Sequence, residues 1–378
     1  MSAKDAVILN FVGLKNKSFS SFMPKPYYIF SSGILRRKDN TLYFEPLEEG
    51  NFEEDEDILC FVGYPERDCE DRSAKRKPIP VEDIDSIYIF GEMTFNVKFF
   101  NFLSQNNIIL HIFNHYGFYS GSFYPREFLN SGRLLIRQVE HYLFDELRLF
   151  LARKIVDGAS YNMLRNLKNY LSNDELEIYI EAIEVERVKI ESCGDIHELM
   201  ACEGHIRSAY YMAWPHIVND EFFYFDKRTK QPPGNAINAL ISFGNSMLYT
   251  VVLGEIYKTY LNPTISYLHE PSDRRFSLAL DLAEIFKPVI VDRLIFRMIN
   301  RGQLSREHFV GELNFCYLSE EGRKIFVREF NEFLESTVKY KKFNRNVSYR
   351  GLIRLECYRL IKHLLGDEVY EPLKVWWY

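Results

Sequence analysis

Hydrophobic and polar residues alternate along the first third of the chain, which is the pattern of strands with one buried face. Residues 27–46 read as two strands joined by a polar turn at Lys38, Asp39 and Asn40. The charged stretch 48–80 predicts a surface excursion between strands. Further strands are predicted at 58–64, 86–91, 108–114 and 117–124, with a short helix at 97–107.

From Asn130 onward, apolar residues recur at the three- and four-residue spacing of helices. The segment 134–158 is long and amphipathic, and Gly158 at its end is typical of a helix C-cap. Further helices are predicted at 161–170, 174–190, 195–214, 235–260, 277–300, 319–339 and 348–365. The pattern therefore predicts an α+β protein, in which an N-terminal β-rich domain (1–124) precedes a larger all-α C-terminal domain (130–378).

Composition places the chain among soluble globular proteins, since 47% of its 378 residues are hydrophobic and 26% are charged. Six cysteines are scattered without a CxxC pair, which favours reduced thiols over a disulfide framework or a zinc site. The N-terminus does not resemble a signal peptide, and no apolar run approaches the roughly 18 residues of a membrane helix. We therefore expect a cytoplasmic protein without a membrane partner.

Charge is distributed unevenly, although the net charge of -6 argues mildly against a nucleic-acid coat. Residues 48–57 form an acidic run, and residues 339–354 contain Lys and Arg but no acid. A protein with this net charge can grip a phosphate backbone only by gathering its basic residues on one side. The candidates for DNA binding are Arg228, Lys230, Arg274, Arg275, Lys341, Lys342 and Arg345, and the alternative for each is an ordinary solvated surface.

A candidate metal site lies at residues 265–301. His269 stands in a polar turn, and the helix that begins near Ser277 carries Asp281 and Glu284 three residues apart on one face. An imidazole and carboxylates beside an apolar stripe suit Mn²⁺ or Mg²⁺. The alternative is an ordinary first helical turn, where acidic residues favour the positive end of the helix dipole. Asp281 lies closer to the core-facing stripe than Glu284 does, so Glu284 is the better candidate ligand.

Glu203 is the second informative residue, because it falls on the apolar stripe of the predicted helix 195–214. A carboxylate facing the core costs several kcal/mol unless a cation compensates it. One such cation is Arg207, which lies one helical turn later and could form an intrahelical ion pair. The other is a bound metal ion, and the presence of His269 and Glu284 in the chain favours the metal.

Several motifs, taken in order, resemble the Cas1 family, the CRISPR-associated endonucleases and integrases of spacer acquisition. They include GILRRKDNTLYF, GFYSGSFYP, CEGHIRSAYY, PPGNAINALISFGNSMLY and YLHEPSDRRFSLALDLAEIF. The resemblance implies an N-terminal β domain, a helical catalytic domain, and a homodimer formed largely through the β domains. It also implies that two such dimers flank a Cas2 dimer in a heterohexameric integration complex.

The resemblance also implies roles for individual residues. Glu203, His269 and Glu284 would be catalytic ligands of Mg²⁺ or Mn²⁺, with Asp281 and Asn238 as supporting residues and Arg228 or a neighbour as the family's basic residue. The family often has aspartate where this chain has Glu284. The implied activity is insertion of spacers into CRISPR arrays, by attack of a 3′-OH on a repeat phosphodiester, or cleavage of double-stranded and branched DNA. The alternative is a non-catalytic DNA-binding scaffold subunit of the same complex.

Overall fold

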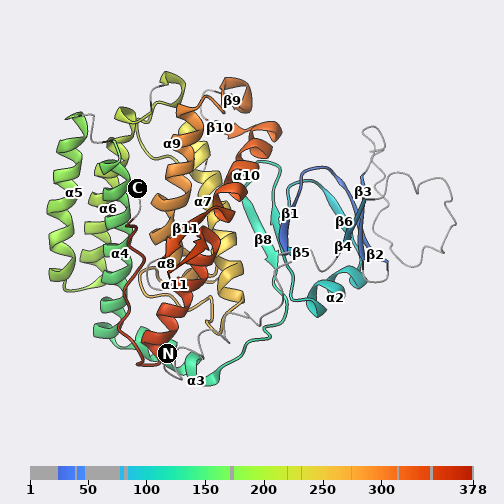
Figure 1. Ribbon diagram of the computed structural model, residues 1–378, viewed down its shortest axis with the longest axis horizontal. Helices are drawn as coiled ribbons and strands as arrows, with labels where there is room; N and C mark the ends of the chain where they lie inside the picture. The colour runs from blue at the N-terminus through green and yellow to red at the C-terminus, as the bar shows by residue number, and fades with distance from the viewer. Residues whose placement is uncertain are drawn as a thin grey trace.

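A strand-rich N-terminal part packs beside a larger helical part in the computed structural model (Figure 1). The described residues are 24–38, 41–46, 77–80, 84–170, 174–218, 220–230, 232–273, 275–312, 315–340 and 344–376. The strand predicted at 58–64 lies outside these ranges, as do Asp39 and Asn40 of the turn predicted at residues 38–40. The fold class predicted from the sequence, strands first and mainly helices afterwards, is confirmed.

The N-terminal part contains two four-stranded sheets in the described ranges. The first has the order β1 (Lys25–Ile29), β5 (Ile84–Ile89), β7 (Ile109–Phe113), β8 (Tyr119–Phe123). The second has the order β4 (Lys77–Pro80), β3 (Thr41–Pro46), β2 (Gly33–Lys38), β6 (Met93–Phe95). The predicted hairpin is the antiparallel pair of β2 and β3. The pattern in residues 27–46 contains three strands rather than two, because the chain changes sheets between β1 and β2.

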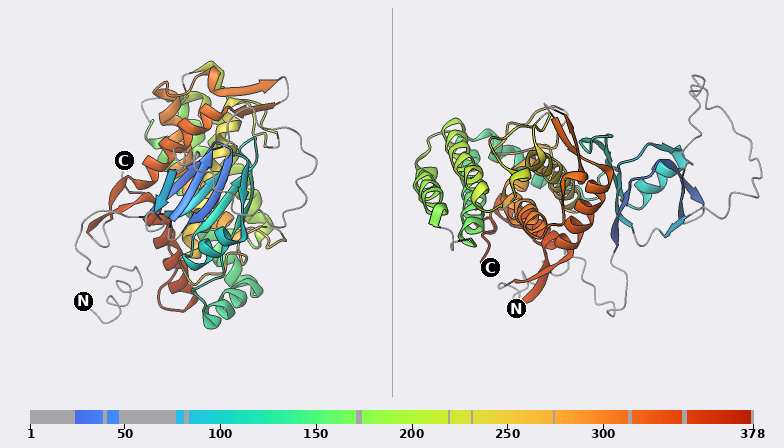
Figure 2. Two further views of the ribbon diagram at one scale, coloured as in Figure 1. Left: turned by 90° about the vertical axis from the view of Figure 1, so that its right-hand side faces the viewer. Right: turned by 90° about the horizontal axis from the view of Figure 1, so that it is seen from above.

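The first sheet lies between the helical part and the second sheet (Figure 2), and its strand β5 is buried on both faces. Along β5, Ile87 and Ile89 face the N-terminal core, to which helix α2 (Val97–Gln105) contributes Phe99. The alternate residues Tyr88 and Phe90 belong to the core of the helical part. This follows from the two-residue period of a strand, and it anchors the helices against a rigid sheet.

Nine α-helices form most of the C-terminal part in the described ranges. They are α3 (Gly132–Leu143), α4 (Asp145–Lys168), α5 (Glu177–Lys189), α6 (Ile196–Met212), α7 (Ala236–Tyr257), α8 (Ser277–Phe286), α9 (Arg293–Asn300), α10 (Glu320–Glu335) and α11 (Tyr349–Leu364). This part is not purely helical. Two short antiparallel hairpins join β9 (Phe309–Glu312) to β10 (Phe315–Leu318) and β11 (Thr337–Tyr340) to β12 (Arg345–Ser348).

The helix end predicted at Gly158 is wrong, whereas the ends of the helix predicted at 277–300 are confirmed. The chain breaks at Phe144, and α4 then runs straight through Gly158 rather than ending there. Gly158 is needed for space, since a Cβ atom on it would lie 2.7 Å from Cβ of Pro372. The helix predicted at 277–300 is interrupted by a π-helical segment (Lys287–Asp292) that contains Pro288, whose ring cannot continue a regular helical ladder.

Helix α7 is the central helix, and most of its residues are buried. By length and composition it could cross a membrane, but 78% of its most apolar window is buried inside the protein, as in a core helix. The segment after α11 also packs on the body. Val375 is buried, and its N–H donates to Oδ1 of Asn162 in α4 at 3.0 Å. Nδ2 of Asn162 donates to the carbonyls of Leu373 (2.9 Å) and Ile285 (3.0 Å), so one amide joins the tail to α8.

Candidate active site

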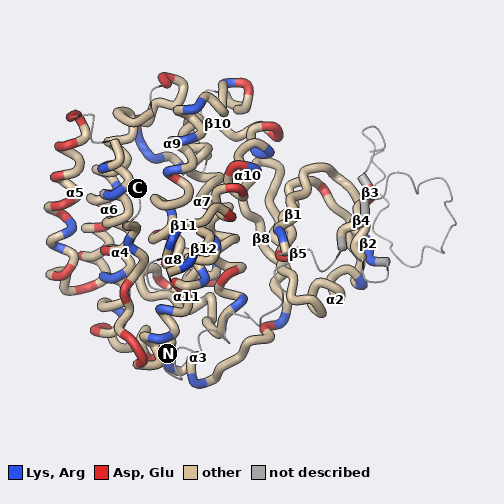
Figure 3. The backbone as a smooth tube through the Cα atoms, in the orientation of Figure 1, with Lys and Arg blue, Asp and Glu red and all other residues tan. Residues whose placement is uncertain are grey.

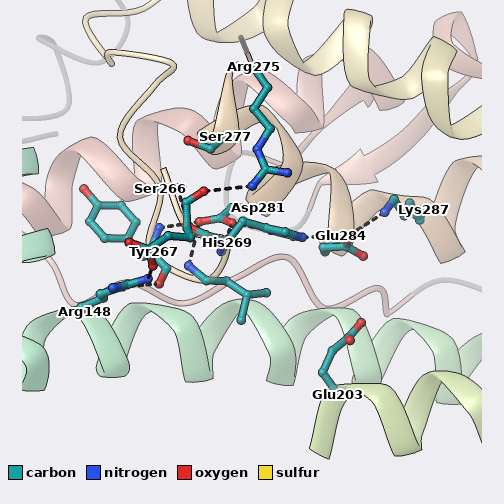
Figure 4. Close-up of polar contacts among 12 residues, drawn as sticks. Arg148, Glu203, Ser266, Tyr267, His269, Arg275, Ser277, Asp281, Glu284 and Lys287 are labelled. Carbon is teal, nitrogen blue, oxygen red and sulfur yellow. Dashed lines mark hydrogen bonds and ion pairs between the residues drawn. The ribbon is translucent and has the colours of Figure 1, made fainter. Parts of the chain in front are cut away.

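One buried carboxylate organises the turn that precedes α8 (Figure 4). Asp281 has no exposed surface and accepts hydrogen bonds from the backbone N–H groups of Tyr267 (2.6 Å), Leu268 (3.0 Å) and His269 (2.9 Å). It also contacts Nδ1 of His269 at 2.8 Å. Arg148 on α4 braces the same turn, since its Nε donates to the carbonyl of Tyr267 at 3.0 Å. The position of His269 is therefore fixed by Asp281 on α8, which contacts both its backbone and its ring, and by Arg148 on α4, which holds the same turn.

The contact with Asp281 also sets the tautomer of His269. An ionised carboxylate can only accept, so Nδ1 carries a proton and Nε2 of the neutral ring has a free lone pair. Nε2 lies 4.0 Å from Oε1 of Glu284, on the side away from Asp281. Burial lowers the pKa of His269, but the hydrogen bond and charge of Asp281, together with the charge of Glu284, outweigh burial and raise it above the ordinary value.

Glu203 and Glu284 converge on a single cation, Arg207. The guanidinium contacts the carboxylate of Glu203 one turn earlier on α6 and the carboxylate of Glu284 on α8. Lys287 contacts the other oxygen of Glu284 at 2.5 Å. Burial opposes the charge of Glu284, but Arg207 and Lys287 outweigh it and hold the pKa of this carboxyl well below its ordinary range. The intrahelical ion pair of Glu203 with Arg207 is thus present, and Arg207 also brings the carboxylates of two helices together.

These side chains are of the types that bind a divalent cation, but they are not arranged to hold one as they stand. Two carboxylates and an imidazole nitrogen with a free lone pair are suitable ligands for Mn²⁺ or Mg²⁺. Within the described ranges, however, no three His, Cys, Asp or Glu side chains are grouped closely enough to hold a metal ion as they stand. Arg207 occupies the space between Glu203 and Glu284, so a metal ion could bind both carboxylates only if this guanidinium moved.

A cleft with a volume of about 690 Å³ surrounds this group. Glu203, His269 and Glu284 all line it, and Phe118 and Tyr119, at the start of β8, form part of its wall. Three of the residues predicted to bind DNA also line the cleft, namely Arg228, Lys230 and Arg275. Arg345 lies on β12 and does not line it. Arg274, Lys341 and Lys342 lie outside the described residues.

Asn238 does not line the cleft but holds the loop of residues 227–230, which we call the basic loop. It is fully buried near the start of α7, and its Nδ2 donates to the carbonyl of Lys227 at 2.8 Å. Its Oδ1 accepts from a guanidinium nitrogen of Arg228 (2.9 Å) and from the backbone N–H of Thr229 (3.1 Å). One amide therefore holds three consecutive loop residues, which directs Arg228 to its place in the cleft wall.

Several cleft residues were missed by the sequence analysis. Lys287 follows Glu284 by three residues, so the helical spacing that linked Asp281 to Glu284 could also have identified it. Ser242, Asn245 and Ser246 interrupt the apolar run of α7 and line the cleft. Polar residues recurring on one face of an otherwise buried helix were the available signal for them. Tyr211, also in the cleft, gave no such signal within its aromatic segment.

The fold and the residues of the cleft are those of a family of CRISPR-associated proteins. The family model for CRISPR associated protein Cas1 matches residues 27–332. A CRISPR-associated endonuclease Cas1 from Moorella thermoacetica is 53% identical over 353 residues, covering 93% of this chain and 100% of the relative. One from Clostridium perfringens is 48% identical over 94% of this chain and 100% of the relative. The chain belongs to the Cas1 family, as its motifs predicted.

Solved structures agree with this assignment. A Cas1 protein from Thermotoga maritima matches with a TM-score of 0.79 at 40% identity, over 92% of this chain and 100% of that chain. A casposase bound to integration product matches with a TM-score of 0.76 at 21% identity, over 94% of each chain. A Cas6-RT-Cas1–Cas2 complex matches with a TM-score of 0.75 at 18% identity, over 95% of this chain and 37% of that chain. At such identities the last two share the fold alone.

Proposed function

We propose that this protein is a metal-dependent DNA endonuclease and integrase that inserts new spacers into CRISPR arrays. Cas1 relatives that are 53% and 48% identical over nearly the whole chain carry the name endonuclease. The observation that carries the proposal is the convergence of Glu203 and Glu284 on one half-buried cation, Arg207, beside an imidazole held by Asp281. Carboxylates gathered in a cleft that is otherwise basic suit a phosphodiester substrate and a divalent cation.

The ligands in this proposal are Glu203, His269 and Glu284, and a bound Mg²⁺ or Mn²⁺ would polarise the scissile phosphate and stabilise its developing charge. The contact of Asp281 with Nδ1 of His269 leaves Nε2 to bind the metal ion once the ring is neutral. In DNA joining, a 3′-OH attacks a repeat phosphodiester, a new P–O bond forms, and the bond to the leaving 3′-oxygen breaks. With water as the nucleophile, the same exchange cuts the DNA.

The basic side chains of the cleft can balance negative charge both in the metal-free arrangement and when DNA and a metal ion are bound. Arg228, Lys230 and Arg275 lie where they can neutralise phosphates flanking the reacting group. Arg207 and Lys287 neutralise the carboxylates in the metal-free arrangement. Arg207 would have to leave one carboxylate for a metal ion to bind both, and a neighbouring phosphate would then be an alternative partner for its guanidinium.

The partners in this proposal are double-stranded and branched DNA, a second copy of the chain and a Cas2 dimer. A casposase bound to integration product and a complex containing Cas1 and Cas2 share this fold, which supports DNA and Cas2 as partners. We propose a homodimer formed largely through the strand-rich parts, with two dimers flanking a Cas2 dimer in a heterohexameric integration complex. The location proposed for this complex is the cytoplasm, in keeping with the four free cysteines of the described ranges.

The test is integration of labelled DNA into a plasmid that carries the repeat, in Mn²⁺ or Mg²⁺. Glu203→Ala and His269→Ala should each abolish joining and leave the far-ultraviolet circular dichroism and thermal unfolding close to wild type. Glu181→Ala, which removes an exposed carboxylate from α5, is the matched control and should join DNA normally. Joining near the wild-type level by Glu203→Ala or His269→Ala would remove that residue from the mechanism. A wild-type chain that binds DNA but never joins it would instead support a scaffold.

A further inference from the structure

Arg207 stands between two carboxylates that come from different helices. Its Nη2 contacts Oε1 of Glu203 on α6 and Oε2 of Glu284 on α8, and its Nε donates to the same oxygen of Glu203 at 2.5 Å. Figure 4 shows the side chain of Glu203 pointing toward Glu284. One nitrogen atom of Arg207 is therefore in contact with both oxygens, at the place that a metal ion bridging them would take.

The charges around Glu284 cancel without a metal ion. Lys287, one turn later on α8, contacts Oε1 of Glu284 at 2.5 Å, so the two carboxylates of Glu203 and Glu284 face the two cations Arg207 and Lys287. Glu284 is buried and Glu203 is half-buried, so little water screens these charges. A divalent ion added to this neutral group would leave it with excess positive charge, and like charges repel strongly where water is scarce.

An ordinary ion pair in the helical part has a different setting. Charged residues of both signs recur along α5 (Figure 3), and Arg187 on that helix pairs with Asp157 at 2.7 Å. The side chains of Arg187 and Arg207 are equally exposed, at 19% and 20%. Arg187 does not line the cleft, whereas Arg207 lines it and joins two of the proposed metal ligands. Arg207 is therefore the cation that a metal ion has to displace.

Bound DNA would supply another partner for this guanidinium. Arg207 lines the same cleft as Arg228, Lys230 and Arg275, the proposed contacts to flanking phosphates. A guanidinium binds a phosphate as it binds a carboxylate, because either group can accept two of its N–H groups at once. The negative charge of the phosphate also offsets the excess positive charge of a bound ion. DNA would thus remove both obstacles to the metal ion, the guanidinium in its place and the uncompensated charge.

We propose that Arg207 makes metal binding conditional on DNA. Without DNA, its guanidinium holds Glu203 and Glu284 together and competes with the ion for their oxygens. When DNA is bound, a phosphate becomes the partner of the guanidinium, and the carboxylates are released to the metal ion. This inference rests on the proposed function, because it takes Glu203 and Glu284 as the ligands. It adds an order of binding, in which DNA comes first and the metal ion second.

The test measures Mn²⁺ binding by the full chain from the electron paramagnetic resonance of free Mn²⁺. Each titration is run with and without a short duplex that lacks the repeat, kept on ice to prevent cleavage, and binding by the duplex alone is subtracted. The duplex should tighten Mn²⁺ binding by the wild type about tenfold, within the usual range for coupled sites. Without DNA, Arg207→Gln should bind Mn²⁺ about tenfold more tightly than the wild type does, and the duplex should then add less.

Three further variants separate displacement of Arg207 from a mere change of charge. Lys287→Gln also removes a positive charge from Glu284, but it leaves the guanidinium between the carboxylates, so it should tighten Mn²⁺ binding less than Arg207→Gln does. Arg187→Gln removes an equally exposed cation outside the cleft and should leave Mn²⁺ affinity unchanged. Arg207→Lys replaces the fork of donors with one ammonium, which an ion displaces more easily, so its affinity should lie between those of the wild type and Arg207→Gln.

Equal tightening by Arg207→Gln and Lys287→Gln would show that charge alone matters, and it would overturn the proposal. Equal gains from the duplex in the wild type and in Arg207→Gln would do the same. If Arg207→Gln does not fold, wild-type affinity in Arg207→Lys without DNA is the contrary result. Wild-type protein that joins DNA and gives any of these results keeps the proposed function and loses only the role of Arg207. No Mn²⁺ binding by any of the proteins, even with the duplex, would remove the metal site and this inference together.

Discussion

Replacing Asp281 with asparagine tests the idea that this residue builds the site rather than binds the metal ion. The side chain keeps its shape but loses its charge and one of its two acceptor oxygens. The carboxylate of Asp281 contacts four donors, three backbone N–H groups and Nδ1 of His269, at 2.6–3.0 Å. Whichever way the new amide is turned, its NH₂ group opposes two of these donors.

The expected loss of stability follows from those contacts. A hydrogen bond to a charged group contributes about 1.5–3 kcal/mol, and two of the four are lost outright in Asp281→Asn. We therefore expect the free energy of unfolding to fall by about 3–6 kcal/mol, a large part of the roughly 5–15 kcal/mol typical of a folded protein. Metal affinity should also fall by about tenfold or more, because an unbraced His269 is a weaker ligand.

Glu284→Gln is the matched comparison, since it removes one charge from the same helix. Glu203 still neutralises Arg207 in this variant, and Lys287 can turn toward solvent, so the stability loss should be smaller than that of Asp281→Asn. Its metal affinity should fall at least as far as that of Asp281→Asn. Urea unfolding and Mn²⁺ titration by calorimetry measure the two quantities. The reasoning fails if Glu284→Gln is the less stable variant, or if Asp281→Asn unfolds like the wild type.

Three further predictions concern other parts of the structure. Asn238→Ala should lower the free energy of unfolding by about 2–4 kcal/mol and weaken DNA binding, because it releases the basic loop; equal affinity in a DNA titration would contradict this. Burial raises the pKa of Asp292 to about 7, so the folded chain holds a proton there that the unfolded chain releases near pH 4. The free energy of unfolding of the wild type should therefore fall as the pH rises from about 4 to about 7. In urea unfolding, Asp292→Asn should remove about 2–3 kcal/mol of this decline between pH 5 and 8, and parallel pH profiles of the two proteins would refute the prediction. Replacing Lys341, Lys342 and Arg345 with alanine should make the salt dependence of duplex binding shallower by about 0.9 per lost phosphate contact, and an unchanged slope would mean that this segment is only a solvated surface.

The candidate site shows what helical spacing can and cannot predict. The spacing placed Asp281 deeper than Glu284, and the structure agrees, with exposed fractions of 0% and 6%. It also singled out Glu203 as a carboxylate in need of a cation. It could not predict that Arg207 would join Glu203 to Glu284, because contact between α6 and α8 is a tertiary distance between residues about 80 positions apart. Nor could it predict four donors around one buried Asp281.

The errors in the fold have the same origin. Gly158 was interpreted through its local effect as a helix terminator, yet its role is to leave room for Pro372, more than 200 residues later. The change of sheet between β1 and β2 could not be predicted either. The alternation of hydrophobic and polar residues shows which face of a strand is buried, but not which strand it pairs with. Only Pro288 offered a local warning, since a proline within a helical pattern predicts an interruption.

The amide of Asn162 has a consequence for the order in which the protein is made. Its partner carbonyl at Leu373 lies 211 residues further along the chain, so α4 leaves the ribosome long before the segment that covers Gly158. Until that segment arrives, only the carbonyl of Ile285, the neighbour of Glu284, is available to the amide of Asn162. A nascent chain that stops before Leu373 would contain Glu203, His269 and Glu284 without the strap that joins α4 to α8. The hydrogen bonds that join the tail to α4 can therefore form only at the final stage of translation.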